Sequence, residues 1–106
     1  MKVEIFYFAG CPNHVPTAER VRALLEQEGV RAEVEEIEVR TPEQAEALGF
    51  LGSPSVRVDG VDVEPEARGV KTFGFGCRTY VEEGRRVGVP SAAMVQDAIR
   101  QGALRA

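Results

Sequence analysis

The amino-acid sequence predicts an α/β protein in which helices flank a mixed sheet of four to five strands, in the order β-α-β-α-β-β-α. Three observations support this prediction. An apolar strand pattern opens the chain, segments with helical spacing separate the first three strand patterns, and an Asp-Gly turn joins the last two. Strands joined through helices pair in parallel, whereas a tight hairpin adds an antiparallel edge.

Size and composition fit one globular domain spanning residues 1–106. Hydrophobic residues make up 43% of the chain and charged residues 28%, which are ordinary values for such a domain. The net charge of −4 comes without a basic stripe, so we expect no nucleic-acid partner. No apolar run approaches the roughly 20 residues that span a membrane, and no signal-peptide pattern precedes the first strand. We therefore expect a cytoplasmic protein without a membrane partner.

Two strand patterns form the first half of the predicted sheet. Residues 2–8, KVEIFYF, alternate at first and then become apolar on both faces, which is typical of a central strand covered on both sides. Residues 33–39 also alternate, but the phase slips between Val34 and Ile37. This slip predicts a bulge or a late strand start near residues 35–36.

The first helix follows the strand 2–8. Gly29 supplies its C-terminal cap, and its apolar stripe consists of Val15, Ala18, Val21, Leu24 and Leu25. The start has two alternatives. With Asn13 as the N-cap, Pro16 occupies the third helical position, where a free N–H is not needed. With a start nearer Cys11, Pro16 would bend the first turn.

A second, short helix follows the strand 33–39. Thr41 is its expected N-cap, Pro42 its first residue and Gln44 the partner of Thr41 in a capping box. Gly49 is expected to end it.

The segment SVRVDGVDVE predicts an antiparallel hairpin between strands 55–58 and 61–64. Asp59-Gly60 is a preferred two-residue hairpin turn. The register that this turn imposes puts four valines on one face, pairing Val58 with Val61 and Val56 with Val63.

The remainder of the chain is predicted to be a long loop and a last helix. The loop, at about residues 64–80, has no clean period and returns in a short strand near residues 78–81. A loop of this length in a small domain is unusual unless it has a function. Three aromatic residues are expected to hold it on the domain: Phe73, Phe75 and Tyr80. Pro90 is expected to open the last helix, whose apolar face carries Met94, Val95, Ala98 and Ile99.

Cys11 is the first candidate for chemistry, because it lies between a central strand and a helix. Free N–H groups and the helix dipole favour a thiolate at a helix N-terminus. The alternative is a buried, inert thiol, since cysteine is among the most buried residue types. The only histidine, His14, is either a surface residue of the first turn or a group that stabilises the thiolate or carries a proton.

Two motifs resemble the thioredoxin superfamily. CPNH after a central strand is similar to its C-x-x-C site, and GSPSVRV before the hairpin is similar to its cis-proline loop. More narrowly, the chain resembles small bacterial thioredoxin-like proteins that share a CPN, an FLGSP and a later CR-Y segment. The resemblance covers residues 2 to about 63 and implies a thioredoxin-like fold.

The resemblance also implies the substrate-binding residues. The Ser53–Pro54 peptide is expected to be cis, with Pro54 packed against Cys11. The backbone of this loop is expected to pair with an extended thiol substrate, so Pro12, Ser53 and Pro54 are the expected contacts.

His14 stands where the C-x-x-C motif has its second cysteine. Cys77, in the long loop, is then the candidate resolving thiol; the alternatives are a free loop cysteine without a partner and a metal ligand. The neighbouring Arg78 either favours the Cys77 thiolate or is simply solvated. The leading hypothesis is a thiol–disulfide oxidoreductase or redox partner, with Cys11, Cys77 and His14 as catalytic residues. Its substrate would be a thiol or disulfide, proteins included.

Two other functions stay open at this stage. Two thiolates and an imidazole suit a thiophilic metal or organometal, and a thioredoxin-like adaptor would need no chemistry at all. The leading hypothesis requires no cofactor and no metal. The oligomeric state is left open.

Overall fold

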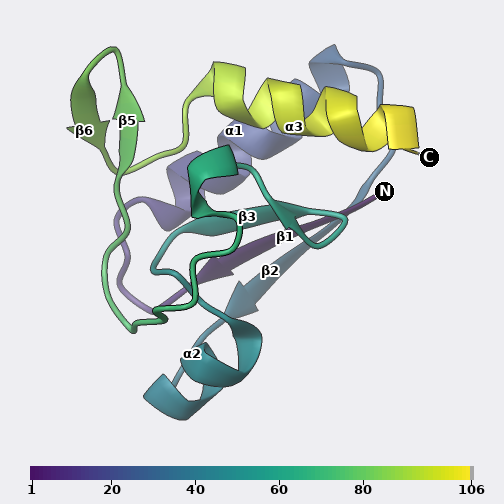
Figure 1. The fold of residues 1–106 in the computed structure, drawn as a ribbon. Helices are drawn as coiled ribbons and strands as arrows, with labels where there is room; N and C mark the ends of the chain where they lie inside the picture. The colour runs from purple at the N-terminus through teal and green to yellow at the C-terminus, as the bar shows by residue number, and fades with distance from the viewer. Residues whose placement is uncertain (106) are drawn as a thin grey trace.

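Four strands form the main sheet of the computed structural model, which describes residues 1–105 (Figure 1). The strand order is β2-β1-β3-β4. β1 is parallel to β2 and antiparallel to β3, and β3 is antiparallel to β4. The bounds of these strands are β1 Lys2–Tyr7, β2 Glu33–Glu38, β3 Ser55–Val58 and β4 Val61–Asp62. The fold is therefore mixed α/β, with the strand that opens the chain at the centre of the sheet.

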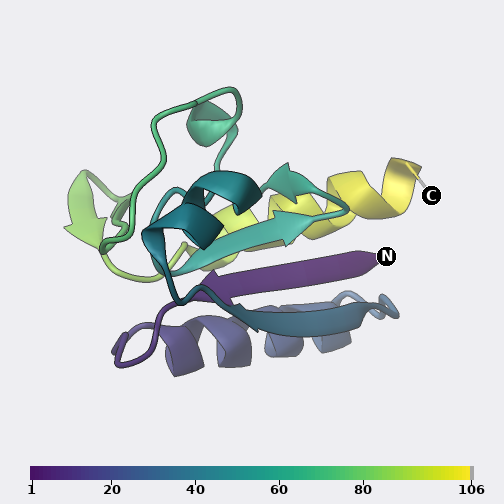
Figure 2. The same cartoon turned by 90° about the horizontal axis from the view of Figure 1, so that it is seen from below.

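Three helices cover the two faces of this sheet. α1 (His14–Gln27) and α3 (Ala92–Arg105) lie on one face, and α2 (Pro42–Leu48) lies on the other (Figures 1 and 2). The larger core lies under α1 and α3 and includes Val3, Ile5, Val21, Val56, Val58, Val95 and Ile99. The smaller core lies under α2 and consists of Phe6, Val39, Ala45 and Phe50, with Phe8, Ile37 and Leu48 packed against it.

The two cores explain the phase slip in β2. The predicted bulge and the alternative of a late strand start are both wrong, because β2 pairs with β1 in continuous parallel register from Glu33 to Glu38. Val34 packs against the core under α1 and α3, whereas Ile37 packs against the core under α2. Apolar residues on opposite faces of one regular strand give the same sequence pattern as a bulge.

α1 begins at His14 with Asn13 as the N-cap residue, so Pro16 occupies the third helical position. The Asn13 side chain makes no capping hydrogen bond. The expected stripe needs one correction: Val15 is 59% exposed, whereas Thr17 is fully buried. Val15 lies outside the arc of the helix that Thr17 and the other buried residues of α1 define.

The capping signals of α2 are confirmed. The Thr41 hydroxyl accepts a hydrogen bond from the Gln44 backbone N–H at 3.0 Å. Gly49 ends the helix in a left-handed conformation, with φ at 66°. α3 starts two residues later than Pro90, because the Ser91 hydroxyl accepts from the Met94 N–H at 3.1 Å and caps the first turn.

The hairpin register is also confirmed. Val58 is paired with Val61, and the Val63 N–H donates to the Val56 carbonyl at 3.1 Å. Three of the four valines are buried in the larger core; Val61, at the edge, is partly exposed.

The predicted fifth strand does not join the main sheet. β5 (Tyr80–Glu82) instead pairs with β6 (Arg85–Val87) in a separate two-stranded hairpin that projects from the domain (Figure 1). The sequence prediction missed β6, whose residues are exposed or only partly buried and show no apolar alternation. Its turn is formed by Glu83 and Gly84, which have φ values of 53° and 75°.

The long loop contains a single helical turn, η1 (Pro65–Ala67), and then runs beside residues 50–53 to β5, with the Gly74 N–H donating to the Phe50 carbonyl. We call its residues 69–77 the strap. Among the helices of residues 1–105, none is long and apolar enough to cross a membrane.

Candidate functional site

Cys11 lies in the turn between β1 and α1, and it is half-buried. Its N–H donates to the Phe8 carbonyl at 3.3 Å, and its own carbonyl accepts from the His14 N–H at 3.4 Å. Pro16 has no N–H, so within the first three helical residues only Val15 keeps a free N–H donor. The helix start therefore offers a thiolate fewer backbone donors than an ordinary first turn does.

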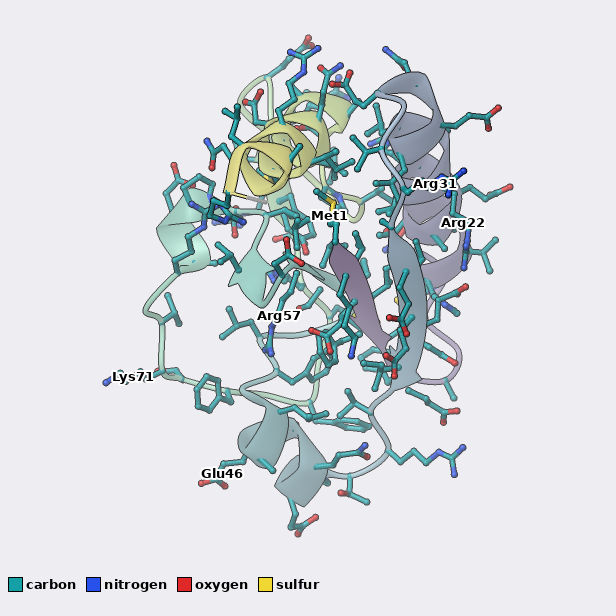
Figure 3. The ribbon with its side chains drawn as sticks, turned by 90° about the vertical axis from the view of Figure 1, so that its right-hand side faces the viewer. Met1, Arg22, Arg31, Glu46, Arg57 and Lys71 are labelled. Atoms are coloured by element: carbon teal, nitrogen blue, oxygen red, sulfur yellow. The ribbon has the colours of Figure 1, made fainter. Side chains whose placement is uncertain are left out.

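His14 faces β2. Its ring is stacked on Tyr7, with centroids 3.6 Å apart and planes at 5°. Its Nε2 is 2.6 Å from Glu36 Oε1, and Arg22 donates to the other Glu36 oxygen at 3.1 Å (Arg22 is labelled in Figure 3). Partial burial raises the pKa of the Glu36 carboxyl, but the hydrogen bonds from Arg22 and His14 outweigh burial, and the pKa is lowered overall.

The contacts of His14 match neither of the two arrangements expected for it. The side chain is 19% exposed and held by a carboxylate, so it is not a free surface residue. Within residues 1–105, its hydrogen-bond partner is Glu36 and not Cys11.

The Ser53–Pro54 peptide is cis, as the resemblance implied. Both residues are buried, and the Ser53 hydroxyl accepts a hydrogen bond from the Phe8 N–H at 3.3 Å. This bond ties the proline loop to the segment that leads into Cys11. Packing of Pro54 against Cys11 itself stays a prediction. Pro12 is exposed beside Cys11.

The strap is paired with the proline loop through backbone hydrogen bonds. The Ser53 N–H donates to the Gly76 carbonyl at 2.8 Å, and the Arg78 N–H donates to the Ser53 carbonyl at 3.0 Å. These two bonds form a parallel bridge between Ser53 and Cys77. The backbone groups that the resemblance assigns to an extended substrate are thus bonded to the chain itself.

Gly52 makes this close approach possible. A Cβ atom at Gly52 would lie 2.9 Å from the Arg78 Cβ and 3.0 Å from the Gly76 carbonyl oxygen. Its φ of +118° is also a conformation that L-residues rarely adopt. The glycine of the FLGSP segment is therefore required by the packing of the strap.

Arg78 anchors the far end of the strap from inside the protein. It is 7% exposed, and its guanidinium donates to both Asp62 oxygens at 2.8 and 2.9 Å. Ser55 and Glu64 each accept a further hydrogen bond at 3.0 Å. Burial lowers the pKa of Arg78, but the Asp62 carboxylate outweighs it, and the pKa is raised overall. Arg78 is thus committed to this buried network and is not solvated.

Tyr80 connects the same segment to the proline loop. It is fully buried, its hydroxyl donates to the Pro54 carbonyl at 2.6 Å, and burial raises its pKa. The expectation that Tyr80 holds the loop on the domain is confirmed. Phe75 contributes through a tilted contact with Phe8, with centroids 5.6 Å apart, although 43% of it is exposed.

No family model matches this chain, and no curated protein matches it either.

A cavity of about 670 Å³ lies beside the strap. Phe8 and Ala9, which follow β1, line it together with Val39, Phe75 and Cys77. Cys77 is exposed, and both cysteines are free thiols. Cys11 does not line the cavity, although Ala9 is only two residues away from it along the chain.

The three candidate metal ligands are not assembled. Among residues 1–105, no group of three or more His, Cys, Asp or Glu side chains is placed to hold a metal ion. The sequence analysis also missed three partners of the site: Asp62 and Ser55, which are buried, and Tyr7, which is partly buried. The CR-Y spacing was the one sequence signal that pointed to the Arg78 network.

Proposed function

We propose that this protein is a thiol–disulfide oxidoreductase or redox partner with a thioredoxin-like fold, in which Cys11 is the nucleophile and Cys77 the second thiol. One observation carries the proposal. A half-buried free thiol follows the central strand β1, and the cis Ser53–Pro54 loop is hydrogen-bonded to the same segment through Phe8.

The topology supports the fold part of the proposal. The central strand β1 is parallel to β2 and antiparallel to β3, which forms a hairpin with β4, and helices cover both faces (Figure 2). The β5-β6 hairpin and the strap are additions to that plan.

The proposed reaction uses two exchange steps. The Cys11 thiolate attacks one sulfur of a substrate disulfide; a mixed disulfide forms, and the other half of the substrate leaves as a thiolate. The Cys77 thiolate then attacks the Cys11 sulfur, a Cys11–Cys77 disulfide forms, and the second half leaves. The substrate gains two electrons, and the protein dithiol is oxidised.

The strap is central to the second step, because it carries Cys77. Its bridge to Ser53 holds Cys77 next to the proline loop, at the end of the sheet where β1 leads into the Cys11 turn. His14 has no part in these steps, since its ring is bonded to Glu36 and stacked on Tyr7. The same commitment argues against the metal-binding alternative, which needs His14 as a ligand.

Alkylation kinetics test the proposal. Cys77→Ser and Cys11→Ser each leave a single thiol, and the rate of iodoacetamide labelling at neutral pH is measured for both by intact mass. Cys11 is expected to react faster than Cys77 and faster than free N-acetylcysteine. Oxidation of the unmodified protein is expected to remove two thiol hydrogens from its mass. Slow labelling of Cys11 with no mass loss on oxidation would instead support a non-catalytic adaptor.

A further inference from the structure

The cavity beside the strap has the size and lining of a small-molecule site. Its volume of about 670 Å³ falls within the range of roughly 300–1,000 Å³ that is typical of ligand pockets. Three of its walls are apolar and come from separate elements: Phe8 after β1, Val39 after β2 and Phe75 in the strap. Aromatic and apolar surfaces of this kind bind the apolar body of a ligand by removing it from water.

The polar residues of the cavity favour an uncharged ligand. Glu38 and Arg40 line one side, and they pair with each other, with Arg40 Nε 3.5 Å from Glu38 Oε2. Their charges cancel, so this side attracts neither an anion nor a cation strongly.

Cys77 puts a thiol on the wall of this cavity. Cys77 is exposed, and the bridge to Ser53 fixes its backbone. The thiol is therefore carried by a part of the loop whose position is fixed by hydrogen bonds. The same bridge occupies both backbone hydrogen-bonding groups of Ser53, which leaves no free edge there for an extended peptide. A compact ligand fits this arrangement, whereas a polypeptide strand does not.

We infer that the cavity binds the apolar body of an uncharged, low-molecular-weight disulfide and that Cys77 is the residue modified by it. The Cys77 thiolate attacks one ligand sulfur; the ligand S–S bond breaks, a mixed disulfide forms on Cys77, and the other half leaves as a thiolate. The inference goes beyond the proposed function because it does not involve Cys11. Its consequence for that function is that the modified Cys77 no longer serves as the second thiol.

The test uses the full chain carrying Cys11→Ser, so that Cys77 is the only thiol. Two methanethiosulfonate reagents with the same leaving group transfer either a benzylthio or a 2-hydroxyethylthio group, and intact mass gives the rate of each. The ratio of the two rates is divided by the same ratio for N-acetylcysteine. We expect this corrected ratio to favour the benzyl reagent by about tenfold. A tenfold preference requires only part of the free energy that complete burial of a phenyl ring provides. The rate of the benzyl reagent is also expected to saturate with concentration.

Phe75 and Phe73 supply a matched pair of variants in that background. Phe75→Ser removes an aromatic wall of the cavity, whereas Phe73, two residues earlier and similarly exposed, lines a different hollow beside α2. Phe75→Ser is expected to abolish the benzyl preference, and Phe73→Ser to keep it. A corrected ratio near one with linear kinetics would overturn the inference, as would an equal loss in both variants. Because Cys11 is absent throughout, neither outcome bears on the proposed nucleophile.

Discussion

Ser53 and Cys77 lie side by side in a parallel bridge, so that the residue before the cis proline and the second cysteine belong to one hydrogen-bonded unit. Gly52, next to Ser53, leaves room for the strap to approach. Arg78, next to Cys77, points into the interior and donates to Asp62. The geometry of the candidate site therefore depends on residues that carry no thiol chemistry themselves.

Gly52→Ala should separate the strap from the proline loop. The new Cβ would lie 2.9 Å from the Arg78 Cβ and would sit at a φ of +118°. Strain and overpacking together are expected to lower the free energy of unfolding by about 3 kcal/mol, measured by urea denaturation. Gly74→Ala is the control, because a Cβ there meets no atom within 4 Å; its effect should stay within about 0.5 kcal/mol. Equal effects would show that the close approach at Gly52 is unimportant.

Arg78→Met should be strongly destabilising. It leaves the Asp62 carboxylate, whose side chain is only 9% exposed, without its bidentate partner. Removing one member of a buried ion pair costs about 3–5 kcal/mol, which chemical denaturation will measure. Arg40→Met breaks a pair in which the arginine is 74% exposed, and it should cost no more than about 1 kcal/mol. A loss below about 1 kcal/mol for Arg78→Met would contradict the structural role of the network.

Tyr80→Phe tests the hydrogen bond to the proline loop. The change removes the donor that lies 2.6 Å from the Pro54 carbonyl and leaves that buried acceptor unpaired. The free energy of unfolding should fall by about 1–3 kcal/mol. Tyr7→Phe, which keeps the ring that stacks on His14, is the matched control and should change stability by no more than about 0.5 kcal/mol. If both variants behave alike, the Tyr80 hydroxyl does not stabilise the loop.

The Glu36 carboxyl is expected to make the free energy of unfolding depend on pH in the acid range. Its pKa is lower in the folded protein than in the unfolded chain, so its contribution is fully present above the unfolded pKa of about 4.3. The contribution is lost as the pH falls through the lower folded pKa. Glu36→Gln should therefore be less stable than the unmodified protein at neutral pH, and the difference should shrink as the carboxyl is protonated. Denaturation midpoints over a pH series measure this.

Glu33→Gln is the control for that series, because Glu33 lies on the same strand, whereas the hydrogen bonds of His14 and Arg22 go to Glu36. Its difference from the unmodified protein should not follow the same acid profile. A constant difference between Glu36→Gln and the unmodified protein at all pH values would contradict the assignment.

Local signals in the sequence were sufficient wherever one turn or cap decided the structure. The predictions made from the Asp59-Gly60 turn and from the Thr41 cap were both confirmed, because each feature acts through atoms within a few residues. The β2 bulge was wrong because the sequence does not say which face of a strand meets which core. β6 was missed because an exposed two-stranded hairpin needs no apolar alternation.

For the candidate site too, some features were predicted from local signals in the sequence and others were not. The cis Ser53–Pro54 peptide was predicted from a motif, and the position of Cys11 followed from a strand that runs into a helix. The hydrogen bond between His14 and Glu36 could not be predicted, since Glu36 lies on another element, 22 residues further along the chain.

The sequence by itself determined the order of the main-sheet strands and the three α-helices, the hairpin register and the placement of Cys11, because periodicity, caps and turns act over short distances along the chain. Only the tertiary structure decided that Cys77 is bridged to Ser53 and that Arg78 is buried on Asp62. Those contacts join residues that are far apart in the sequence, and they form only when the tertiary fold brings both partners together, a condition that no local pattern records.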